Sequence, residues 1–249
     1  MSGGTSIQRP PSGLPSRRLP VDLALVALVA LVAWIVAVDR MRGMDMGPGT
    51  ALGTLGWYLG IWFTMMAAMM LPSALPVLRL YSRTAGRMTS TVGFTTGYLA
   101  VWTAFGLAAY GVQQLLSGRL PWETSGRYLA GAAIVAAGLY QLTPVKEVSL
   151  RHCRSPMGFL ITNWRDGPVG PVTMGAHHGL YCAGCCAALM VTLFALGVMS
   201  LFWMAIVAVT VLGEKVLPGG ERLSRGVALG LLALGVWVAA GGLVHPSGM

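Results

Sequence analysis

Seven long apolar blocks constrain this chain more than any other feature of its sequence. They cover residues 21–38, 54–71, 91–116, 127–143, 177–197, 199–217 and 223–243. A helix rises about 1.5 Å per residue, so about 20 residues cross the ~30 Å hydrocarbon core of a bilayer. The short alternating segments of a membrane barrel are not found, so helices are expected. The sequence predicts an all-α, polytopic transmembrane helical bundle of six to seven spans over residues 21–244.

Charged residues avoid these blocks. Only 10% of the chain is charged, against about 25% in an average soluble protein, and 55% is hydrophobic. The eight acidic residues lie outside the block interiors or at their ends. Because a charge at the bilayer centre costs at least about 2.5–3.5 kcal/mol, this avoidance is expected of membrane spans and excludes a large soluble domain.

The basic residues predict an orientation. With the N-terminus in the cytoplasm, Arg40, Arg42, Arg119 and Arg127 lie outside, and the other 13 of the 17 Lys and Arg residues lie inside. This asymmetry follows the positive-inside rule and predicts that the N-terminus is inside and the C-terminus outside. The net charge of +9 is explained by topology and anionic lipid. Nothing resembles a nucleic-acid module, so nucleic acid is not an expected partner.

The ends of the apolar blocks and the segments between them give further expectations about the organisation of the chain. Residues 1–20, rich in Ser, Gly and Pro, are expected to form a disordered cytoplasmic tail, and the first block is read as an uncleaved anchor rather than a signal peptide. Only residues 197–200 separate the fifth and sixth blocks, which fits either a tight turn or one broken helix. The pairs Gly56/Gly60, Gly93/Gly97 and Gly226/Gly230 would allow close helix packing.

The densest chemical signal lies in the fifth block. Cys182, Cys185 and Cys186 fall within five residues of one another. Positions three and four apart share a helix face, so His178 and Met190 extend the same stripe. Soft sulfur donors favour Cu(I), Zn(II) or iron–sulfur clusters. A lone cysteine usually packs as a small hydrophobe, but three at helical spacing with a histidine one turn away favour a metal site.

Two further signals fall on the same predicted membrane side. Met66, Met69 and Met70 share one face of the second span, and methionine there is either core packing or a ligand. Cys153 leaves the fourth span on the cytoplasmic face and could complete a site with Cys182. The cytosol keeps thiols reduced, so the cysteines favour a metal site over a disulfide. An inverted topology would instead favour a membrane thiol–disulfide oxidoreductase.

A wider set of residues accompanies these motifs. It comprises Met65-x-x-Ala68-Met69-Met70-x-Pro72, Gly97-Tyr98 with Trp102, Tyr140-Gln141 through Pro144 and Lys146, Cys153-Arg154-x-Pro156, Gly179-x-x-Cys182-x-Gly-Cys185-Cys186 with Leu189-Met190, Gly197-x-Met199, Trp203-Met204 and Glu214-Lys215. Together they resemble a bacterial domain-of-unknown-function family of predicted metal-binding integral membrane proteins. The resemblance covers roughly residues 55–216, and its most specific part is the Cys-x-Gly-Cys-Cys segment.

The resemblance implies a multi-pass helical protein of the bacterial cytoplasmic (inner) membrane with a metal site. The chain departs from the family pattern at three positions. Ser149 stands where the family often has a cysteine, Ala187 where it has a tryptophan, and Ser200 where it has an asparagine. The first departure leaves Cys153 as the only thiol of its segment.

The leading hypothesis is a membrane protein that binds a soft metal ion, Cu(I) first and zinc second, at the cytoplasmic side. It would handle, deliver or transport the metal, with a membrane enzyme or a metallochaperone as partner. Cys182, Cys185 and Cys186 are the predicted ligands. The candidates for completing the shell are Cys153, His178, Met66, Met69, Met70 and Met190.

Several other functions are weighed against this one. The spans hold almost no carboxylate, which argues against a proton-coupled pump, and there is no P-loop for ATP hydrolysis. The first rival is a structural or assembly subunit whose cysteines merely pack. The second, and the only enzymatic one, is a dithiol oxidoreductase that uses Cys182 and Cys185. Glu214-Lys215 is expected to pair with Lys146 or Glu147 and to fix helix ends.

Overall fold

The computed structural model describes residues 19–42, 53–117, 126–197 and 200–241, and over these ranges the ordered elements are all helices. The helices are α1 (Leu19–Met41), α2 (Leu55–Ala85), α3 (Met88–Ser117), α4 (Arg127–Gln141), α5 (Pro144–Arg154), α6 (Pro156–Asn163), α7 (Gly170–Leu196), α8 (Leu201–Val216) and α9 (Gly220–Ala239). The predicted all-α class is thereby confirmed for the described ranges. Nearly all of the predicted tail, residues 1–18, lies outside them.

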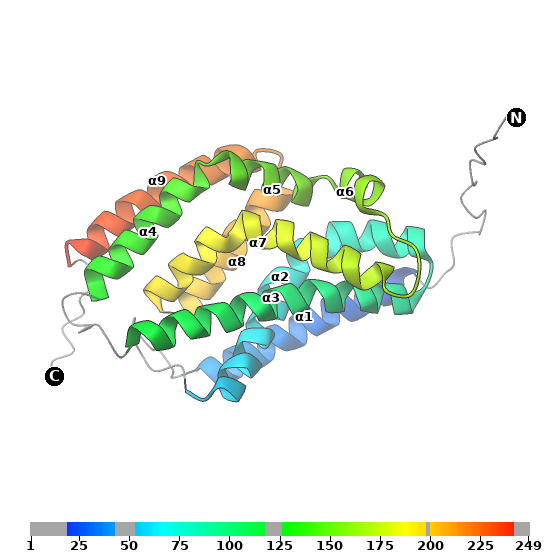
Figure 1. Ribbon diagram of the computed structural model, residues 1–249, viewed down its shortest axis with the longest axis horizontal. Coiled ribbons are helices and arrows are strands. Elements are labelled where there is room, and N and C mark those ends of the chain that lie inside the picture. Colours follow the sequence, from blue (N-terminus) through cyan, green and yellow to red (C-terminus); the bar gives the residue numbers. More distant parts are fainter. Residues whose placement is uncertain (1–18, 43–52, 118–125, 198–199, 242–249) are drawn as a thin grey trace, which may run out of the picture.

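Helix α7 occupies the middle of the bundle (Figure 1). It packs against α3, α4, α5 and α8, while α2 packs against α1, α3 and α8. Helices α4 and α9 form a closely packed pair on the side away from α1. The helix that carries three of the cysteines is therefore enclosed by neighbours, whereas α1 and α9 lie at the two edges.

Five of the described helices are long and apolar enough to cross a membrane: α1, α2, α3, α7 and α9. Helices α4 and α5 would make a sixth if they count as one broken span, since they are bent by 64° at their junction. The bend has a local cause, because Pro144 starts α5 and the Thr143 side chain caps it by accepting a hydrogen bond from the Lys146 N–H. Helix α8 has only 16 residues. The predicted count of seven spans therefore stays a prediction.

The fifth and sixth apolar blocks form separate helices. Helix α7 ends at Leu196 and α8 begins at Leu201, while residues 198–199 lie outside the description. Gly197 ends α7 at a φ of +115°, a conformation that side-chain-bearing residues rarely adopt. Cys182 lies 14 residues before the end of α7, and Lys215 lies 14 residues after the start of α8. The two helices thus form an antiparallel hairpin that brings this pair to the same level.

One of the three glycine pairs packs closely in the way the sequence predicts. A Cβ atom on Gly97 would lie 2.0 Å from the carbonyl oxygen of Val172, so α3 and α7 approach backbone to backbone. Gly175 on α7 is equally tight, since its Cβ would lie 1.9 Å from the carbonyl oxygen of Phe94. Small residues permit such an approach between apolar helices. The pairs at 56/60 and 226/230 have nothing within 4 Å of their Cβ positions.

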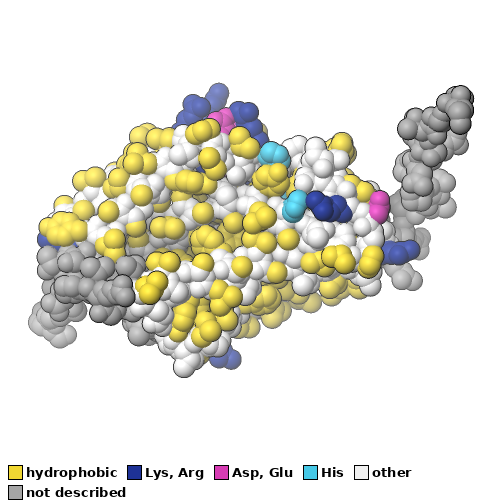
Figure 2. All heavy atoms as spheres, in the orientation of Figure 1, with side chains coloured by type: hydrophobic (Ala, Val, Ile, Leu, Met, Phe, Trp, Pro, Cys, Tyr) yellow, Lys and Arg dark blue, Asp and Glu magenta, His cyan; other side chains and the backbone are white. Residues whose placement is uncertain are grey.

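The outer surface of the bundle is largely apolar. Figure 2 shows hydrophobic side chains spread along its length, with Lys and Arg gathered mainly at the top and toward the right of the view. Leu28 of α1, Val209 of α8 and Leu229 of α9 are all more than half exposed. Apolar exposure of this extent marks a surface that contacts a membrane or other proteins.

Candidate metal centre

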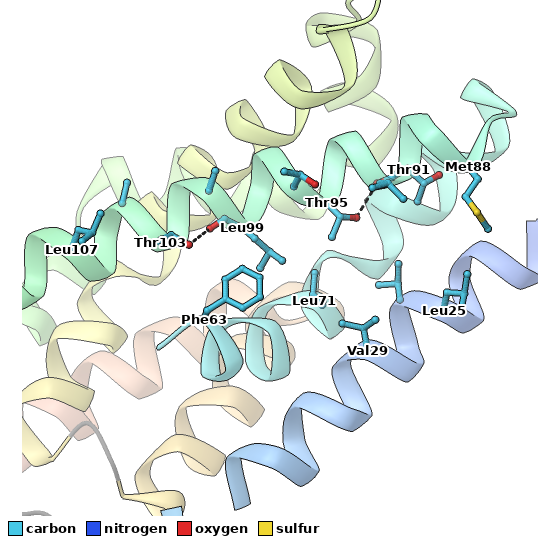
Figure 3. A pocket seen from close by; sticks show the side chains of 15 residues that line it. Leu25, Val29, Phe63, Leu71, Met88, Thr91, Thr95, Leu99, Thr103 and Leu107 are labelled. Carbon is cyan, nitrogen blue, oxygen red and sulfur yellow. Dashed lines mark hydrogen bonds between the residues drawn. The ribbon is translucent and has the colours of Figure 1, made fainter. Parts of the chain in front are cut away.

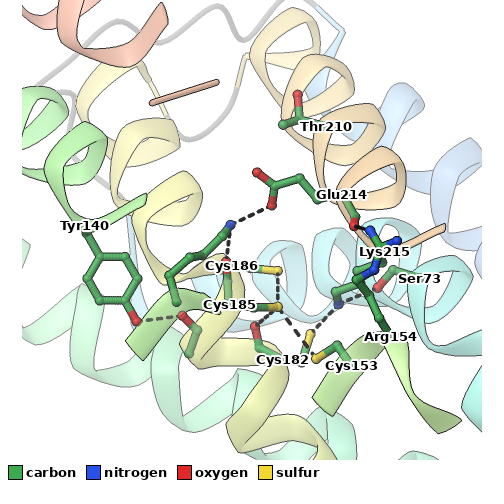
Figure 4. Close-up of polar contacts among 12 residues, drawn as sticks. Ser73, Tyr140, Cys153, Arg154, Cys182, Cys185, Cys186, Thr210, Glu214 and Lys215 are labelled. Carbon is green, nitrogen blue, oxygen red and sulfur yellow. Dashed lines mark hydrogen bonds and ion pairs between the residues drawn. The ribbon is translucent and has the colours of Figure 1, made fainter. Parts of the chain in front are cut away.

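Three cysteine side chains of α7 meet inside the bundle (Figure 4). The sulfur atoms of Cys182, Cys185 and Cys186 lie within 4.8 Å of one another, and those of Cys185 and Cys186 are 3.3 Å apart. One helix brings them together, because positions three and four residues apart share a face. Each side chain is at most 1% exposed, and all are free thiols. The centre is thus a buried cluster of three soft donors.

The fourth cysteine approaches the cluster from α5. The sulfur of Cys153 lies 3.7 Å from that of Cys185, and the side chain is 6% exposed, the most of the four cysteines. It lies at the edge of the three-sulfur group rather than within it. Helix α5 passes close to Gly184, since a Cβ there would lie 2.7 Å from the hydroxyl oxygen of Ser149.

A lysine from α8 contacts the cluster directly. The ammonium of Lys215 donates to the sulfur of Cys182 at 2.9 Å and to the hydroxyl oxygen of Ser73 at 3.0 Å. Ser73 in turn donates its proton to the carbonyl of Met70 at 2.8 Å, which leaves its oxygen free to accept from Lys215. Lys215 is 7% exposed. It was expected to take part in an ion pair, and its contact with a cysteine is a finding of the structure.

A second buried lysine lies on the other side of the cluster. Lys146 of α5 is 2.6 Å from the carboxylate of Glu214, and both side chains are 1% exposed. The Lys146 ammonium also donates to the carbonyl oxygen of Cys185 at 2.7 Å. The predicted pairing of Glu214-Lys215 with Lys146 is confirmed, with Glu214 as the partner. Glu147, the alternative, pairs with Arg151 on the surface.

Arg154 holds the end of α8 in place. Its guanidinium donates to the carbonyl oxygens of Glu214 at 2.7 Å and of Leu217 at 2.8 Å. Gly220 leaves room for this contact, since a Cβ there would lie 1.8 Å from the guanidinium. The helix end that carries Glu214 and Lys215 is therefore tied to the segment that carries Cys153.

Tyr98 of α3 is a further neighbour of the cluster. Its hydroxyl lies 3.0 Å from the sulfur of Cys182 and donates to the carbonyl of Met70 at 3.3 Å. The side chain is 1% exposed. Tyr98 and Lys215 both belong to the residues that carry the family resemblance, which is the only sequence signal that pointed to them. Both residues lie far from Cys182 along the chain, so a rule based on residue spacing does not predict these contacts.

His178 lies one turn before Cys182 but outside the sulfur group. Its ring packs among Phe94, Tyr98 and Phe159, with centroid distances of 5.9, 5.7 and 5.0 Å. The Nδ1 atom is buried and has no hydrogen-bond partner among the described residues. The structure thus places His178 in an aromatic pocket beside the centre.

The predicted methionines are all buried. Met66, Met69, Met70 and Met190 are each at most 2% exposed. Met70 contacts the centre through its carbonyl oxygen, which accepts from both Ser73 and Tyr98. These contacts place the second half of α2 beside the cysteines.

A cavity of about 600 Å³ lies away from this centre, between α1, α2 and α3 (Figure 3). Its lining is mostly aliphatic, and the hydroxyls of Thr95 and Thr103 donate to carbonyls of their own helix. None of the four cysteines lines it. The space is therefore unsuited to a soft cation, and the chemistry of the bundle is concentrated at the cysteines.

The donor set fits a soft metal ion. Thiolate sulfur is the ligand that selects Cu(I), zinc and iron–sulfur clusters, and three sulfurs within 4.8 Å of one another can ligate one ion together. A family model described as a copper chaperone, PpoB2, matches residues 59–238, well over half of the chain. The chain belongs to the PpoB2 copper chaperone family. No curated protein and no solved structure matches it.

The family match encloses the centre. Residues 59–238 include all four cysteines, both buried lysines and Tyr98, whereas α1 lies before the matched segment. The copper chaperone family and the three-cysteine cluster together support the predicted metal handling, with copper as the metal.

Proposed function

We propose that this chain is a membrane-embedded copper chaperone that binds one Cu(I) ion through Cys182, Cys185 and Cys186. The observation that carries the proposal is the group of three buried sulfurs within 4.8 Å of one another. Membership of the copper chaperone family supports copper as the cargo. Binding replaces thiol protons with the ion, so each sulfur that ligates releases its proton, and the ion stays shielded from water.

Cys153 is the best placed of the further candidate ligands. It is the most exposed of the four cysteines and lies 3.7 Å from the sulfur of Cys185. An incoming ion held by a donor thiolate meets Cys153 first and then passes to the buried group by thiolate exchange. His178 remains a candidate because its Nδ1 has no partner in the described part of the chain.

The methionines Met66, Met69, Met70 and Met190 are weaker candidates for the shell. Their burial around the centre equally fits apolar packing. Zinc is the second candidate ion, because Cys153 together with the three-sulfur group would supply the four thiolates of a structural zinc site.

The bundle is proposed to sit in the bacterial cytoplasmic membrane with its N-terminus inside. Five long apolar helices and the apolar outer faces of α1, α8 and α9 support membrane integration. The positive-inside distribution supports a cysteine centre near the cytoplasmic side. Copper would arrive from a cytoplasmic metallochaperone and leave to a membrane enzyme. Thiol accessibility mapped with a membrane-impermeant reagent at introduced cysteines tests this orientation.

The metal content of the detergent-purified protein tests the proposal. Wild type and a Cys182→Ser/Cys185→Ser/Cys186→Ser variant are loaded anaerobically with Cu(I) or Zn(II), desalted and measured by elemental mass spectrometry. We expect about one copper per chain in the wild type and none in the variant, with equal helicity as the control for folding.

The rivals predict other results. A structural or assembly subunit would retain no metal in either protein. A dithiol oxidoreductase would show a disulfide between Cys182 and Cys185 that cycles with an added oxidant and reductant. Roughly equal copper in wild type and the triple variant would refute the proposed ligands.

A further inference from the structure

Lys215 is a buried cation without a carboxylate partner among the described residues. Its ammonium touches the sulfur of Cys182 and the hydroxyl of Ser73. Within the described ranges, no carboxylate lies within ion-pair distance of it. A lone charge in a protein interior is costly unless another charge compensates it. The position at the C-terminal end of α8 helps, because the helix dipole favours a cation there.

The other cation at the centre is already compensated. Lys146 forms its ion pair with Glu214, so the two together contribute no net charge to the cysteine cluster. In the described part of the chain, the hydrogen bonds of the Arg154 guanidinium go to carbonyl oxygens at the end of α8. Among the described residues, the basic side chain that directly touches a sulfur of the cluster is therefore Lys215.

Metal binding would supply the missing negative charge. One Cu(I) ion carries one positive charge and three thiolates carry three negative charges, so the proposed copper centre carries two negative charges. A buried anion without a compensating charge pays a large desolvation cost. An ammonium in contact with one of the sulfurs compensates one of these two charges.

We infer that Lys215 is the counter-charge of the copper centre and sets how tightly it holds Cu(I). The inference rests on the proposed Cu(I) binding and assigns one residue of α8 a part in it. Ser73 fixes the position of the ammonium, because its own proton is committed to the carbonyl of Met70. Lys215 is thus a positioning residue, which acts on the metal through Cys182.

A lysine that only fills space predicts a different behaviour. Its replacement by any side chain of similar size would change unfolding and metal binding together, whether or not the new side chain is charged. The counter-charge predicts that the sign of the charge decides metal affinity. Substitution by methionine would add a soft ligand, so the informative neutral variants are Lys215→Gln, which keeps N–H donors, and Lys215→Leu.

The experiment compares Cu(I) affinity in wild type, Lys215→Gln, Lys215→Leu and Lys215→Arg. Full-length protein in detergent competes anaerobically for Cu(I) with a chromogenic Cu(I) chelator. We expect the dissociation constant to rise at least about tenfold in both neutral variants, because a compensating charge in contact is lost. Lys215→Arg should stay within about threefold of wild type. Arg222→Gln, which removes an exposed cation at the start of α9, is the matched control and should leave affinity unchanged.

The outcomes separate this inference from the proposed function. Wild type that binds Cu(I) with neutral variants of equal affinity would overturn the role of Lys215 and leave the cysteine site intact. Wild type that binds no Cu(I) would refute the proposed function itself. A loss in Lys215→Arg as large as in Lys215→Gln would show that shape, not charge, is what the centre requires. Thermal unfolding of each variant without metal shows which of them are folded. If Lys215→Leu does not fold, the affinity of Lys215→Gln decides the test.

Discussion

The two buried lysines on either side of the cysteine cluster differ in their charge partners. On the α5 side, Lys146 pairs with Glu214 at 2.6 Å and reaches only a backbone carbonyl of the cluster. On the α2 side, Lys215 touches a cysteine sulfur and a serine hydroxyl, and no carboxylate of the described residues lies within ion-pair distance of it. Both lysines come from helix segments next to α7, and both are almost fully buried.

This difference suggests different roles for the two lysines, a structural one for Lys146 and a metal-binding one for Lys215. An ion pair that is complete without metal holds helix ends together whether or not the centre is loaded. A cation without a carboxylate partner is compensated when the cysteines bind a metal ion as thiolates. We therefore expect changes on the Lys146 side to alter stability first, and changes on the Lys215 side to alter metal binding first.

The largest expected effect is on the Lys146 side. Glu214→Ala removes the carboxylate and leaves the Lys146 ammonium buried and unpaired, which should destabilise the bundle by about 3–5 kcal/mol. Unfolding of the metal-free protein in detergent measures it. The control is Lys146→Leu/Glu214→Leu, which removes both charges and should recover most of the loss. A cost below about 1 kcal/mol for Glu214→Ala would show that the pair is not structural.

A smaller effect is expected at Tyr98, which shares Cys182 with Lys215. Tyr98→Phe removes one buried hydroxyl and should cost about 1 kcal/mol of stability. Tyr58→Phe is the matched control, because the hydroxyl of Tyr58 also donates to a backbone carbonyl, that of Gly106, at 3.1 Å. Both variants should lose similar stability, but only Tyr98→Phe should change the rate at which a chelator removes Cu(I). Equal rates of Cu(I) removal from the two variants would show that the Tyr98 hydroxyl contributes to stability and not to metal binding.

The smallest expected effect is that of removing an exposed ion pair, and it serves as a reference for the buried contacts. Arg151 on the same helix as Lys146 forms exposed ion pairs with Glu147 and with Glu221, the latter at 3.6 Å. Arg151→Gln should change stability by less than about 0.5 kcal/mol, because solvent screens exposed pairs. The change should shrink further at high salt. A loss that approaches that of Glu214→Ala would mean that burial is not what distinguishes the pairs.

Much of the fold could be predicted because it depends on local pattern. Apolar blocks of sufficient length predict helices, and the structure has helices there. The bend between α4 and α5 was not predicted, although Thr143 and Pro144 signal it locally. The length of α8 also differs from a full span, since its first residues follow the Gly197 turn rather than continuing α7.

The candidate site likewise has a part that follows from local sequence pattern and a part that does not. The sequence alone determines that Cys182, Cys185 and Cys186 share a face, because the helix repeat places neighbours three and four residues apart on one side. It also points to Cys153 and to a pairing of Glu214-Lys215 with Lys146 or Glu147, of which the structure shows Glu214 with Lys146. Only the tertiary structure decides that Lys215 and Tyr98 reach Cys182, from 33 and 84 residues away. Those contacts depend on the α7–α8 hairpin and on the packing of α3 against α7 at Gly97. The Gly93/Gly97 pair predicts a close approach, but it does not say which helix is the partner.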